Sequence, residues 1–594
     1  MSGERKISFF NMAKRSIPVV FKAAPGHCAV DIALGTASSA ALALNVAVTQ
    51  NLFDAVAGAA MGSKGFWDCV PALLLFAGLV VGQQIADGAF QFHWRMWIEK
   101  AAGRIKTLLH RKLQRIDPAR FEETEFLDDT NKAREAVCVL PYFVMAILAI
   151  VTDYGVFFAA VGAYLFRLKP MLLVTIMMSF VPALLAQVVR GRVFAKLEAE
   201  NAPIRREYDY YKKALCDREY FKETRILGIF HFLHGLFAGS LRLLTGKTWK
   251  AERNTALLEL SLNITAFLGM GASAAMLFAA TMSGEITVGA FAAVFSALGL
   301  IFGRMERIVT HHMGRLLREI GKVNNFFRLL DMPEVTGAEG TIDFAQGIEA
   351  DKTSFTYPGR DAPAVKDVSL RIQDGETVAI VGENGAGKST LVRLLTGIYR
   401  PSEGAVKIGG LDSAEVSPAS LFRGISGVFQ KYQRYKMTLG ENVAISDVSR
   451  PACPDGIANA LQQADAETYG LDTDAMLSPE YGGTDVSGGQ WQRLAIARGL
   501  YRPCGFIVLD EPTSAIDPVE ETRIYTKFRQ LAEGKCAVIV THRLGSAKLA
   551  HRIVVMDAGQ IVDAGTHEAL LSRPGKYADM WAAQAQWYER EATG

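Results

Sequence analysis

Residues 376–390 read Glu-Thr-Val-Ala-Ile-Val-Gly-Glu-Asn-Gly-Ala-Gly-Lys-Ser-Thr. The apolar run Val378–Val381 predicts a short buried strand, and the glycine-rich turn Gly382–Gly387 leads into a helix. This is the phosphate-binding pattern G-x-x-x-x-G-K-S in its strand, loop and helix setting. Glycines let backbone N–H groups face an anion, and the helix start adds partial positive charge. Lys388 supplies a full charge for the outer phosphates, and Ser389 a hydroxyl ligand for Mg²⁺.

The composition indicates a membrane protein rather than a nucleic-acid-coating one. Half of the 594 residues are apolar, and the net charge is only +3, which argues against a coat on nucleic acid. The seven cysteines are scattered without a C-x-x-C pair, so neither a disulfide framework nor a zinc site is expected. The polar residues 1–22 precede an apolar run without a convincing cleavage site, and we expect them to be retained.

Apolar stretches of about membrane-spanning length fill the first half. The two long gaps, 91–137 and 191–256, carry most of the Lys and Arg of this half and are expected on the cytoplasmic side. Arg167 and Lys169 fall on the outer side and go mildly against that rule. An even number of spans returns the chain to the cytoplasm, which favours six. The expected spans are 28–49, 66–90, 138–165, 169–190, 257–281 and 286–308.

The pattern predicts a multidomain membrane protein in which a six-helix transmembrane domain precedes an α/β P-loop NTPase domain. Residues 4–22 fit an amphipathic helix at the membrane surface and, equally well, a solvated basic tail. The expected divisions are 1–27, a cytoplasmic N-terminal segment with an elbow helix; 28–319, the transmembrane domain; 320–345, a linker; and 346–594, the nucleotide-binding domain.

Several features of the first half have two interpretations. The reversals near Asp117–Phe121 and Asp217–Gly228 either dock onto the nucleotide-binding domain or are ordinary solvated surface. The polar residues in or near the spans line a substrate path, or they sit at helix ends and pair with neighbouring helices; they are Asp31, Asn45, Asp87, Asp153, Glu259 and Asn263. Small residues at four-residue spacing predict close helix packing; they are Gly271, Ala275, Ala279, Gly299 and Gly303.

From about Ile348 short strands alternate with helices, as in a parallel-sheet domain. The apolar run Phe506–Asp510 predicts a strand beside the phosphate-loop strand, with Asp510 delivered to the Mg²⁺ shell. Glu511, one residue later, is placed to polarise a water for attack on the γ-phosphoryl group. The strand ending at His542 places a side chain for the γ-phosphate, although a lone His is more often structural.

Two further motifs gain weight from this order. Tyr357 precedes the phosphate loop and is suited to stacking on adenine, although a lone Tyr usually just packs. Ser487-Gly-Gly-Gln490 opens a helix and forms a second anion-binding surface. One chain needs only one such surface for its phosphates, so Ser487 is expected to face another chain's nucleotide. Taken alone, the motif also fits a plain helix cap.

The combination resembles an ATP-binding cassette (ABC) transporter, and the whole chain resembles a half-transporter of the exporter type. By that resemblance Tyr357 matches the A-loop, Gly382–Ser389 Walker A and Gln430 the Q-loop. Ser487–Gln490 match the signature motif, Asp510 and Glu511 Walker B with its catalytic base, Ser514–Asp517 the D-loop, and His542 the switch histidine. Val486 and Ile516 stand where Leu is usual, and neither departure removes a chemical group.

The resemblance implies ATP and Mg²⁺ as cofactors and two ATP sites at a dimer interface. Glu511, His542 and Gln430 would be catalytic, and Ser389, Gln430 and Asp510 would hold the metal. The nucleotide contacts implied are Tyr357, Gly382, Glu383, Asn384, Gly385, Ala386, Gly387, Lys388, Ser389, Thr390, Ser487, Gly488, Gly489, Gln490 and Asp517. The implied location is a cell membrane, bacterial inner or plasma membrane, with membrane lipids as neighbours and no nucleic-acid partner.

The transported substrate stays open. Residues 429–442 and 482–492 look similar to bacterial exporters of modified peptides, although the nucleotide-binding domain is not expected to touch substrate. Export of a peptide, a lipid or an amphipathic small molecule all fit. Import of a siderophore or cofactor, and pairing with a related chain instead of a second copy, are alternatives. The apolar half argues against a soluble ABC ATPase, and Glu511 with His542 argues against a purely regulatory membrane protein.

Overall fold

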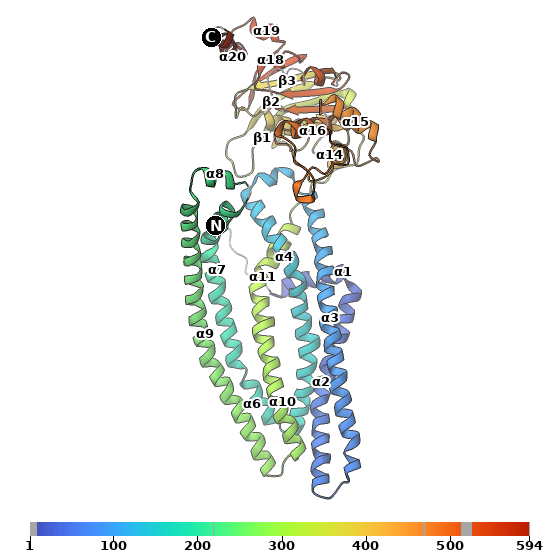
Figure 1. Ribbon diagram of the computed structural model, residues 1–594, viewed down its shortest axis with the longest axis vertical. Coiled ribbons are helices and arrows are strands. Elements are labelled where there is room, and N and C mark those ends of the chain that lie inside the picture. The colour runs from blue at the N-terminus through green and yellow to red at the C-terminus, as the bar shows by residue number, and fades with distance from the viewer. Residues whose placement is uncertain (1–8, 218, 467–469, 512–524, 531, 593–594) are drawn as a thin grey trace. The chain divides into compact units, whose positions relative to one another are not determined.

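The computed structural model describes residues 9–592, except 218, 467–469, 512–524 and 531 (Figure 1). The chain forms two compact units. The helical unit contains residues 1–111 and 129–331, and the nucleotide-binding unit contains residues 112–128 and 332–594. The second unit therefore includes a short segment taken from the middle of the helical half.

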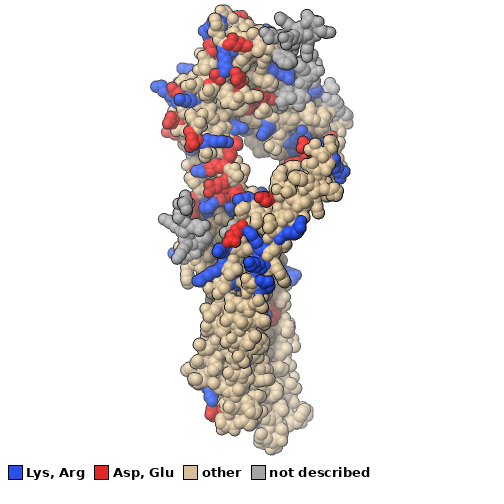
Figure 2. Space-filling model, turned by 90° about the vertical axis from the view of Figure 1, so that its left-hand side faces the viewer, with Lys and Arg blue, Asp and Glu red and all other residues tan. Residues whose placement is uncertain are grey.

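Long helices build the helical unit because apolar runs continue into charged, helix-compatible extensions. Six helices are long and apolar enough to cross a membrane, which confirms the predicted number among the described residues. They are Pro25–Ala60, Phe66–Gln114, Thr124–Leu168, Pro170–Glu198, Phe230–Met282 and Val288–Leu330. Figure 2 shows the charge pattern that results, with a lower part almost free of charged side chains and Lys and Arg gathered above it.

The helical elements follow the chain in order. They are α1 (Phe9–Ala23), α2 (Pro25–Ala60), η1 (Phe66–Asp68), α3 (Val70–Gln114), α4 (Thr124–Ala149), η3 (Ile150–Gly155), α5 (Val156–Leu168), α6 (Pro170–Met178), α7 (Val181–Cys216), α8 (Phe221–Ile226), α9 (Phe230–Met282), α10 (Val288–Arg307), η4 (Ile308–Met313) and α11 (Gly314–Leu330). Two of them, η3 and η4, are π-helical turns that join otherwise continuous α-helices.

The prediction that small residues mark close helix packing was wrong for three glycines, because within this chain they do not pack closely against another helix. A Cβ built on Gly271, Gly299 or Gly303 meets no heavy atom within 4 Å. Close packing occurs instead at Gly289 of α10, where an added Cβ would lie 2.4 Å from the Asp54 carboxylate. The backbone N–H of Gly289 donates to that carboxylate at 2.9 Å, so a hydrogen bond rather than a stripe of small residues brings α10 against α2.

The nucleotide-binding unit contains two sheets. The larger has the strand order β10-β9-β3-β8-β7-β6, and the smaller β2-β1-β4-β5. In the larger sheet, β3, β6, β7, β8 and β9 pair in parallel. The strands are β1 (Ile348–Phe355), β2 (Val365–Ile372), β3 (Thr377–Gly382), β4 (Glu403–Ile408), β5 (Leu411–Asp412), β6 (Ile425–Val428), β7 (Phe506–Asp510), β8 (Cys536–Val540), β9 (Arg552–Asp557) and β10 (Gln560–Gly565).

Helices and short turns surround these sheets. They are η2 (Pro118–Glu122), η5 (Phe344–Gln346), α12 (Lys388–Leu395), α13 (Pro418–Arg423), α14 (Leu439–Ala444), α15 (Pro454–Gln463), η6 (Pro479–Tyr481), α16 (Gly488–Tyr501), α18 (Leu544–Ala547), α19 (His567–Leu571) and α20 (Lys576–Ala592). Every residue of β3, β7 and β8 is buried, as expected for a parallel sheet covered on both faces.

One prediction about this sheet was wrong. Phe506–Asp510 (β7) is not the neighbour of the phosphate-loop strand, because β8 lies between β3 and β7. The apolar runs of β7 and β8 are alike in length and β-branched content, so the local pattern does not rank them. The carboxyl ends of all three strands still meet at one edge of the sheet, which is where α12 begins.

Candidate functional site: a triphosphate loop beside two carboxylates

The phosphate loop has the geometry that its glycines allow. Gly387 has a φ of +94°, and a Cβ there would lie 2.5 Å from the carbonyl oxygen of Ala364. Only glycine meets both conditions without strain. Lys388 begins α12, is 5% exposed, and donates to the carbonyls of Gly382 at 2.9 Å and Glu383 at 3.0 Å. The loop therefore holds its cation in place through the backbone.

Asp510, at the end of β7, lies against the same loop. Ser389 Oγ donates to Asp510 Oδ1 at 3.1 Å, so two of the three predicted metal ligands are brought together. Burial raises the pKa of the Asp510 carboxyl above its usual value, and the hydrogen bond from Ser389 opposes that rise. Burial also lowers the pKa of Lys388, against the attraction of Glu511 and Asp510. A buried carboxylate and a buried ammonium here each favour a bound ion of opposite charge.

Glu511 is held in an unusual backbone conformation for a residue with a side chain. Its φ is +45°, a left-handed value that costs energy and is often found at functional sites. Gln430 Nε2 donates to Glu511 Oε2 at 2.9 Å, and His542 Nδ1 lies 3.6 Å from Glu511 Oε1. The nearby imidazole of His542 is the main cause of the lowered pKa of Glu511. The three residues predicted as catalytic therefore form one group.

The C-terminal helix α20 supports this group, and the sequence reasoning missed it. Gln584 of α20 donates to the carbonyl of His542 at 2.6 Å and accepts from the N–H of Leu544 at 3.0 Å. Lys576, the first residue of α20, lies 3.4 Å from Glu383 of the phosphate loop. No local motif marks these contacts, because they join residues more than 40 positions apart in one case and nearly 200 in the other.

Tyr357 lies in an aromatic cluster next to the loop. Its ring packs edge-on against Phe355 and Tyr399, with centroids 5.1 Å and 6.0 Å away. Its hydroxyl lies 3.0 Å from Thr390 Oγ1 and accepts from Arg393 at 3.1 Å. The residue is only half-buried.

The same cluster contacts the segment 112–128, which comes from between α3 and α4. Tyr399 donates its hydroxyl to Glu122 at 2.8 Å, and Arg393 lies 3.4 Å from the same carboxylate. Ala119 is buried in the core of the nucleotide-binding unit. The docking interpretation of Asp117–Phe121 therefore has direct contacts behind it, whereas the described contacts of α8 lie within the helical unit.

Ser487 caps α16 as the plain interpretation predicted. Gln490 N–H donates to Ser487 Oγ, and Ser487 N–H donates to Gln490 Oε1, which is a capping box. Tyr432 donates to the carbonyl of Gly488 at 3.0 Å. Ser487 and Gly488 are exposed. No hydrogen bond or ion pair among the described residues joins Ser487–Gln490 to the phosphate loop, and the D-loop, Ser514–Asp517, lies outside the described residues.

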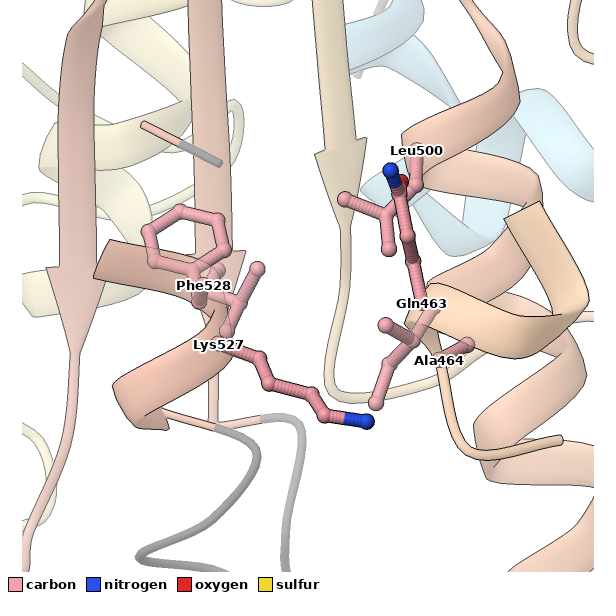
Figure 3. A pocket seen from close by; sticks show the side chains of 7 residues that line it. Gln463, Ala464, Leu500, Lys527 and Phe528 are labelled. Atoms are coloured by element: carbon pink, nitrogen blue, oxygen red, sulfur yellow. The ribbon is translucent and has the colours of Figure 1, made fainter. Parts of the chain in front are cut away.

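A small apolar pocket elsewhere in this unit is a poor ligand site. It is lined by Gln463, Ala464, Ile496, Leu500, Leu509, Lys527 and Phe528. Figure 3 shows Lys527 extending toward Ala464 across its mouth. Its cavity volume is about 10 Å³, which is close to the minimum for a single water molecule.

Comparison with known proteins identifies the group of motifs in the nucleotide-binding unit. The ABC transporter family model matches residues 365–514, which include the phosphate loop, the signature motif and both carboxylates. These residues form an ABC transporter domain. The structure also superposes on a bacterial Atm1-family ABC exporter with ATP bound, with a TM-score of 0.75, 22% identity, and coverage of 96% of this chain and 99% of the other. That likeness shows the exporter fold, a membrane domain fused to a nucleotide-binding domain.

Curated relatives include transporters of two kinds. The subtilin transport ATP-binding protein of Bacillus subtilis is 28% identical over 77% of this chain and 76% of its own length. The nisin transport ATP-binding protein of Lactococcus lactis is 34% identical over 39% of each chain. An ATP-dependent lipid A-core flippase of Thiobacillus denitrificans is 36% identical over 50% of this chain and 52% of its own length. The alignment thus spans 76% of the first relative, 39% of the second and 52% of the third.

These findings establish the coarse function. The ABC transporter is a multi-pass membrane protein that binds ATP and couples ATP hydrolysis to transport, in the manner of the exporters it resembles. Family membership does not name the substrate, because the match covers the ATP-binding machinery and the relatives named for their cargo differ among themselves.

Proposed function

We propose that this ABC transporter exports an amphipathic substrate from the cytoplasm, with Glu511 as the base that activates water for ATP hydrolysis. The observation that carries the proposal is the group around Glu511: Gln430 and His542 contact the same carboxylate, and Lys388 lies 4.0 Å from it. A carboxylate with a lowered pKa stays ionised at neutral pH and so can accept a proton.

The remaining residues divide the work of holding the nucleotide. Lys388 and the loop N–H groups would bind the β- and γ-phosphates, and Tyr357 would stack on the adenine. Ser487–Gln490 and Asp517 would contact nucleotide from a second chain. ATP binds the closed state better than the open one, and that difference in affinity shifts the helical unit between inward-open and outward-open forms.

Mg²⁺ fits the donors present. Ser389 Oγ, Asp510 Oδ1 and the Gln430 side-chain oxygen are hard oxygen ligands, the type that Mg²⁺ prefers. Among the described residues, the buried Asp510 carboxyl has the Ser389 hydroxyl as its side-chain hydrogen-bond partner, and such a carboxyl is suited to a metal-bound complex. When bound, the ion would neutralise charge that develops on the phosphate oxygens.

The proposal includes a second half-transporter chain, either a copy of this one or a related chain. The tip formed by α8 exposes apolar side chains that monomeric surfaces normally cover: Ile226 is 85% exposed and Leu227 65%. Such a patch suits a protein contact, and the nucleotide-binding unit of a second chain is the partner that the ABC architecture supplies. Lys and Arg on the long extensions support a cytoplasmic position of these units at a bacterial plasma membrane.

The test is ATP turnover by the full-length protein in lipid nanodiscs. Wild type should hydrolyse ATP only with Mg²⁺ added, and Glu511→Gln should lower the rate by about 10²- to 10⁴-fold while it still binds ATP. Glu415→Gln, which changes an exposed carboxylate of the same unit, is the matched control and should keep the wild-type rate. Full turnover in Glu511→Gln would remove Glu511 from its role.

A further inference from the structure

The helical unit contains a large cavity between its helices. Its volume is about 630 Å³, within the range of sites for small organic ligands. Side chains from α3, α4, η3, α7, α9, α10, η4 and α11 line it, and both π-helical turns contribute. π-Turns frequently mark functional sites. The polar and aromatic residues that matter below are Asp87, Trp94, Tyr142, Asp153, Arg190, Glu259, Arg304, Arg307, Arg315 and Arg318.

Positive charge exceeds negative charge in this lining. Five arginines face three carboxylates: Asp87, Asp153 and Glu259. Charged groups among membrane helices are costly, so an excess of one sign needs a compensating partner or a function. Figure 2 shows Lys and Arg collected at the level where the uncharged part of the helical unit ends.

The three carboxylates are already engaged. Asp153 accepts from Arg304 Nη1 at 2.7 Å and from the Ser39 hydroxyl. Glu259 accepts from Arg190 Nη1 at 2.9 and 3.1 Å and from Gln187 Nε2 at 3.3 Å. Asp87 accepts from the Ser38 hydroxyl. The pairing interpretation of these acidic residues is therefore correct for Asp153 and Glu259, and all three also line the cavity.

Three arginines remain outside these pairs. Within the described part of the chain, Arg307, Arg315 and Arg318 have no carboxylate within ion-pair distance. Arg307 Nε donates to the carbonyl of Gly303 at 3.3 Å, and the Arg315 guanidinium lies 5.2 Å from the centre of the Tyr142 ring. Their side chains extend from adjacent turns of one continuous helix, α10–η4–α11, so their charges add at one wall.

Two buried N–H donors point to the same ligand chemistry. Trp94 Nε1 and Arg304 Nε are buried, line the cavity, and find no acceptor among the described residues. A buried donor without an acceptor costs about 1–3 kcal/mol, so each calls for an acceptor brought by a ligand. Indole and guanidinium groups only donate hydrogen bonds, which selects an acceptor-rich, anionic group.

Aromatic and apolar side chains also line the cavity. The rings of Trp94 and Tyr142 meet edge to face with centroids 6.4 Å apart, and Phe90 and Met145 add apolar surface. An apolar chain attached to an acidic head would match the apolar as well as the cationic lining, whereas a small inorganic anion would leave the apolar lining uncovered.

We propose that this cavity binds the substrate through an acidic head, a phosphate or carboxylate carried on an apolar chain, with Arg307, Arg315 and Arg318 as the residues that select the charge. The proposal rests on the proposed export function and names the substrate class for it. Arginine binds such oxyanions in a forked, two-point geometry, and its guanidinium stacks on the neighbouring aromatic rings.

The test measures binding of radiolabelled dodecyl phosphate to full-length protein in nanodiscs of phosphatidylcholine, with empty nanodiscs as background. Dodecyl phosphate should compete at a concentration about tenfold lower than dodecylphosphocholine, because the choline cancels the head charge. Dodecyltrimethylammonium and inorganic phosphate should not compete. Equal competition by the three dodecyl compounds would overturn the charge selection, and competition by inorganic phosphate alone would overturn the apolar part.

Variants assign the effect to the three arginines. The triple change Arg307→Gln, Arg315→Gln, Arg318→Gln should weaken dodecyl phosphate binding about tenfold or more. Lys at the same positions should bind dodecyl phosphate more tightly than the Gln triple and more weakly than wild type, because the charge remains while the forked contact is lost. A matched triple on the exposed face of α9, Arg242→Gln, Lys247→Gln, Lys250→Gln, removes equal charge away from the cavity and should bind as wild type. Equal losses in both Gln triples would overturn the assignment.

The outcome separates this inference from the proposed function. Wild-type discs that hydrolyse ATP but do not distinguish the head groups would contradict the inference alone. Discs that bind dodecyl phosphate selectively but never hydrolyse ATP would contradict the proposed function alone.

Discussion

The nucleotide site and the helical cavity both concentrate charged side chains, but they assemble them differently. At the nucleotide site, each residue follows a strand or opens a helix in a short motif, and backbone carbonyls hold Lys388. In the cavity, the charged residues come from several helices, and the paired ones find their partner on another helix, as with Arg304 and Asp153. The first site can be found from local sequence, whereas the second exists only after the helices pack.

Replacing Lys388 tests the nucleotide site, which is built from local motifs, and it has the largest expected effect. Lys388→Ala removes a buried cation beside Glu511 and Asp510, so ATP hydrolysis in nanodiscs should fall about 10²- to 10³-fold. Lys407→Ala, on an exposed position of β4, should stay within about twofold of wild type. A Lys388→Ala protein with near-normal turnover would show that the loop alone binds the phosphates.

Breaking the Arg304–Asp153 ion pair tests the helical cavity, where the paired charges come from different helices. Arg304→Leu leaves the partly buried Asp153 without its cation, and the cost should be about 3 kcal/mol in thermal unfolding of the helical unit. The double change Arg304→Leu, Asp153→Leu removes both charges and should recover most of that loss. Equal destabilisation by the single and the double change would mean that packing, not charge pairing, holds this site.

The hydroxyl of Tyr399 joins the nucleotide cluster to the segment 112–128. Tyr399→Phe removes its hydrogen bond to Glu122, so amide hydrogen exchange in residues 112–128 should speed up about tenfold, while exchange in β3 stays slow. Tyr481→Phe, at a 65% exposed ring, is the control and should leave exchange in 112–128 unchanged. No change in Tyr399→Phe would separate this segment from the cluster.

The smallest expected effect concerns pH. His542 is the main cause of the lowered pKa of Glu511, and Glu511 acts as a base only when it is ionised. Below its folded-state pKa the carboxylate is protonated and turnover falls. His542→Gln should raise that pKa, so the acidic limb of the turnover profile should move to higher pH by less than about one unit. His567→Gln should leave the limb in place, and an unmoved limb in His542→Gln would contradict the coupling.

The sequence predicted more of the nucleotide site than of anything else. Lys388, Ser389, Asp510, Glu511, Gln430 and His542 meet in the structure as the motifs indicated. The strand order was wrong because two apolar runs of equal character compete for the place beside β3. The supports from α20, Gln584 and Lys576, could not be found, since no motif precedes a long-range contact.

In the helical unit the sequence predicted the spans and the acidic residues of the cavity, but it did not single out the arginines of the cavity. Asp87, Asp153 and Glu259 attracted attention because a carboxylate in an apolar helix is costly. The arginines that outnumber them, such as Arg304 and Arg307, fell at the ends of predicted spans, where a basic residue needs no special explanation. The helices continue past those ends, so Arg304 is buried and Arg307 lines the cavity while it stays exposed.

The account depends on ATP hydrolysis at Glu511 moving an anionic amphiphile past the helical unit. The direct measurement is ATP-dependent movement of a fluorescent alkyl phosphate across the membrane of liposomes that contain the protein, followed by quenching from one side. Wild type should move it with ATP and Mg²⁺, and Glu511→Gln should not. Movement at the wild-type rate in Glu511→Gln, or ATP hydrolysis without movement in wild type, would contradict the account.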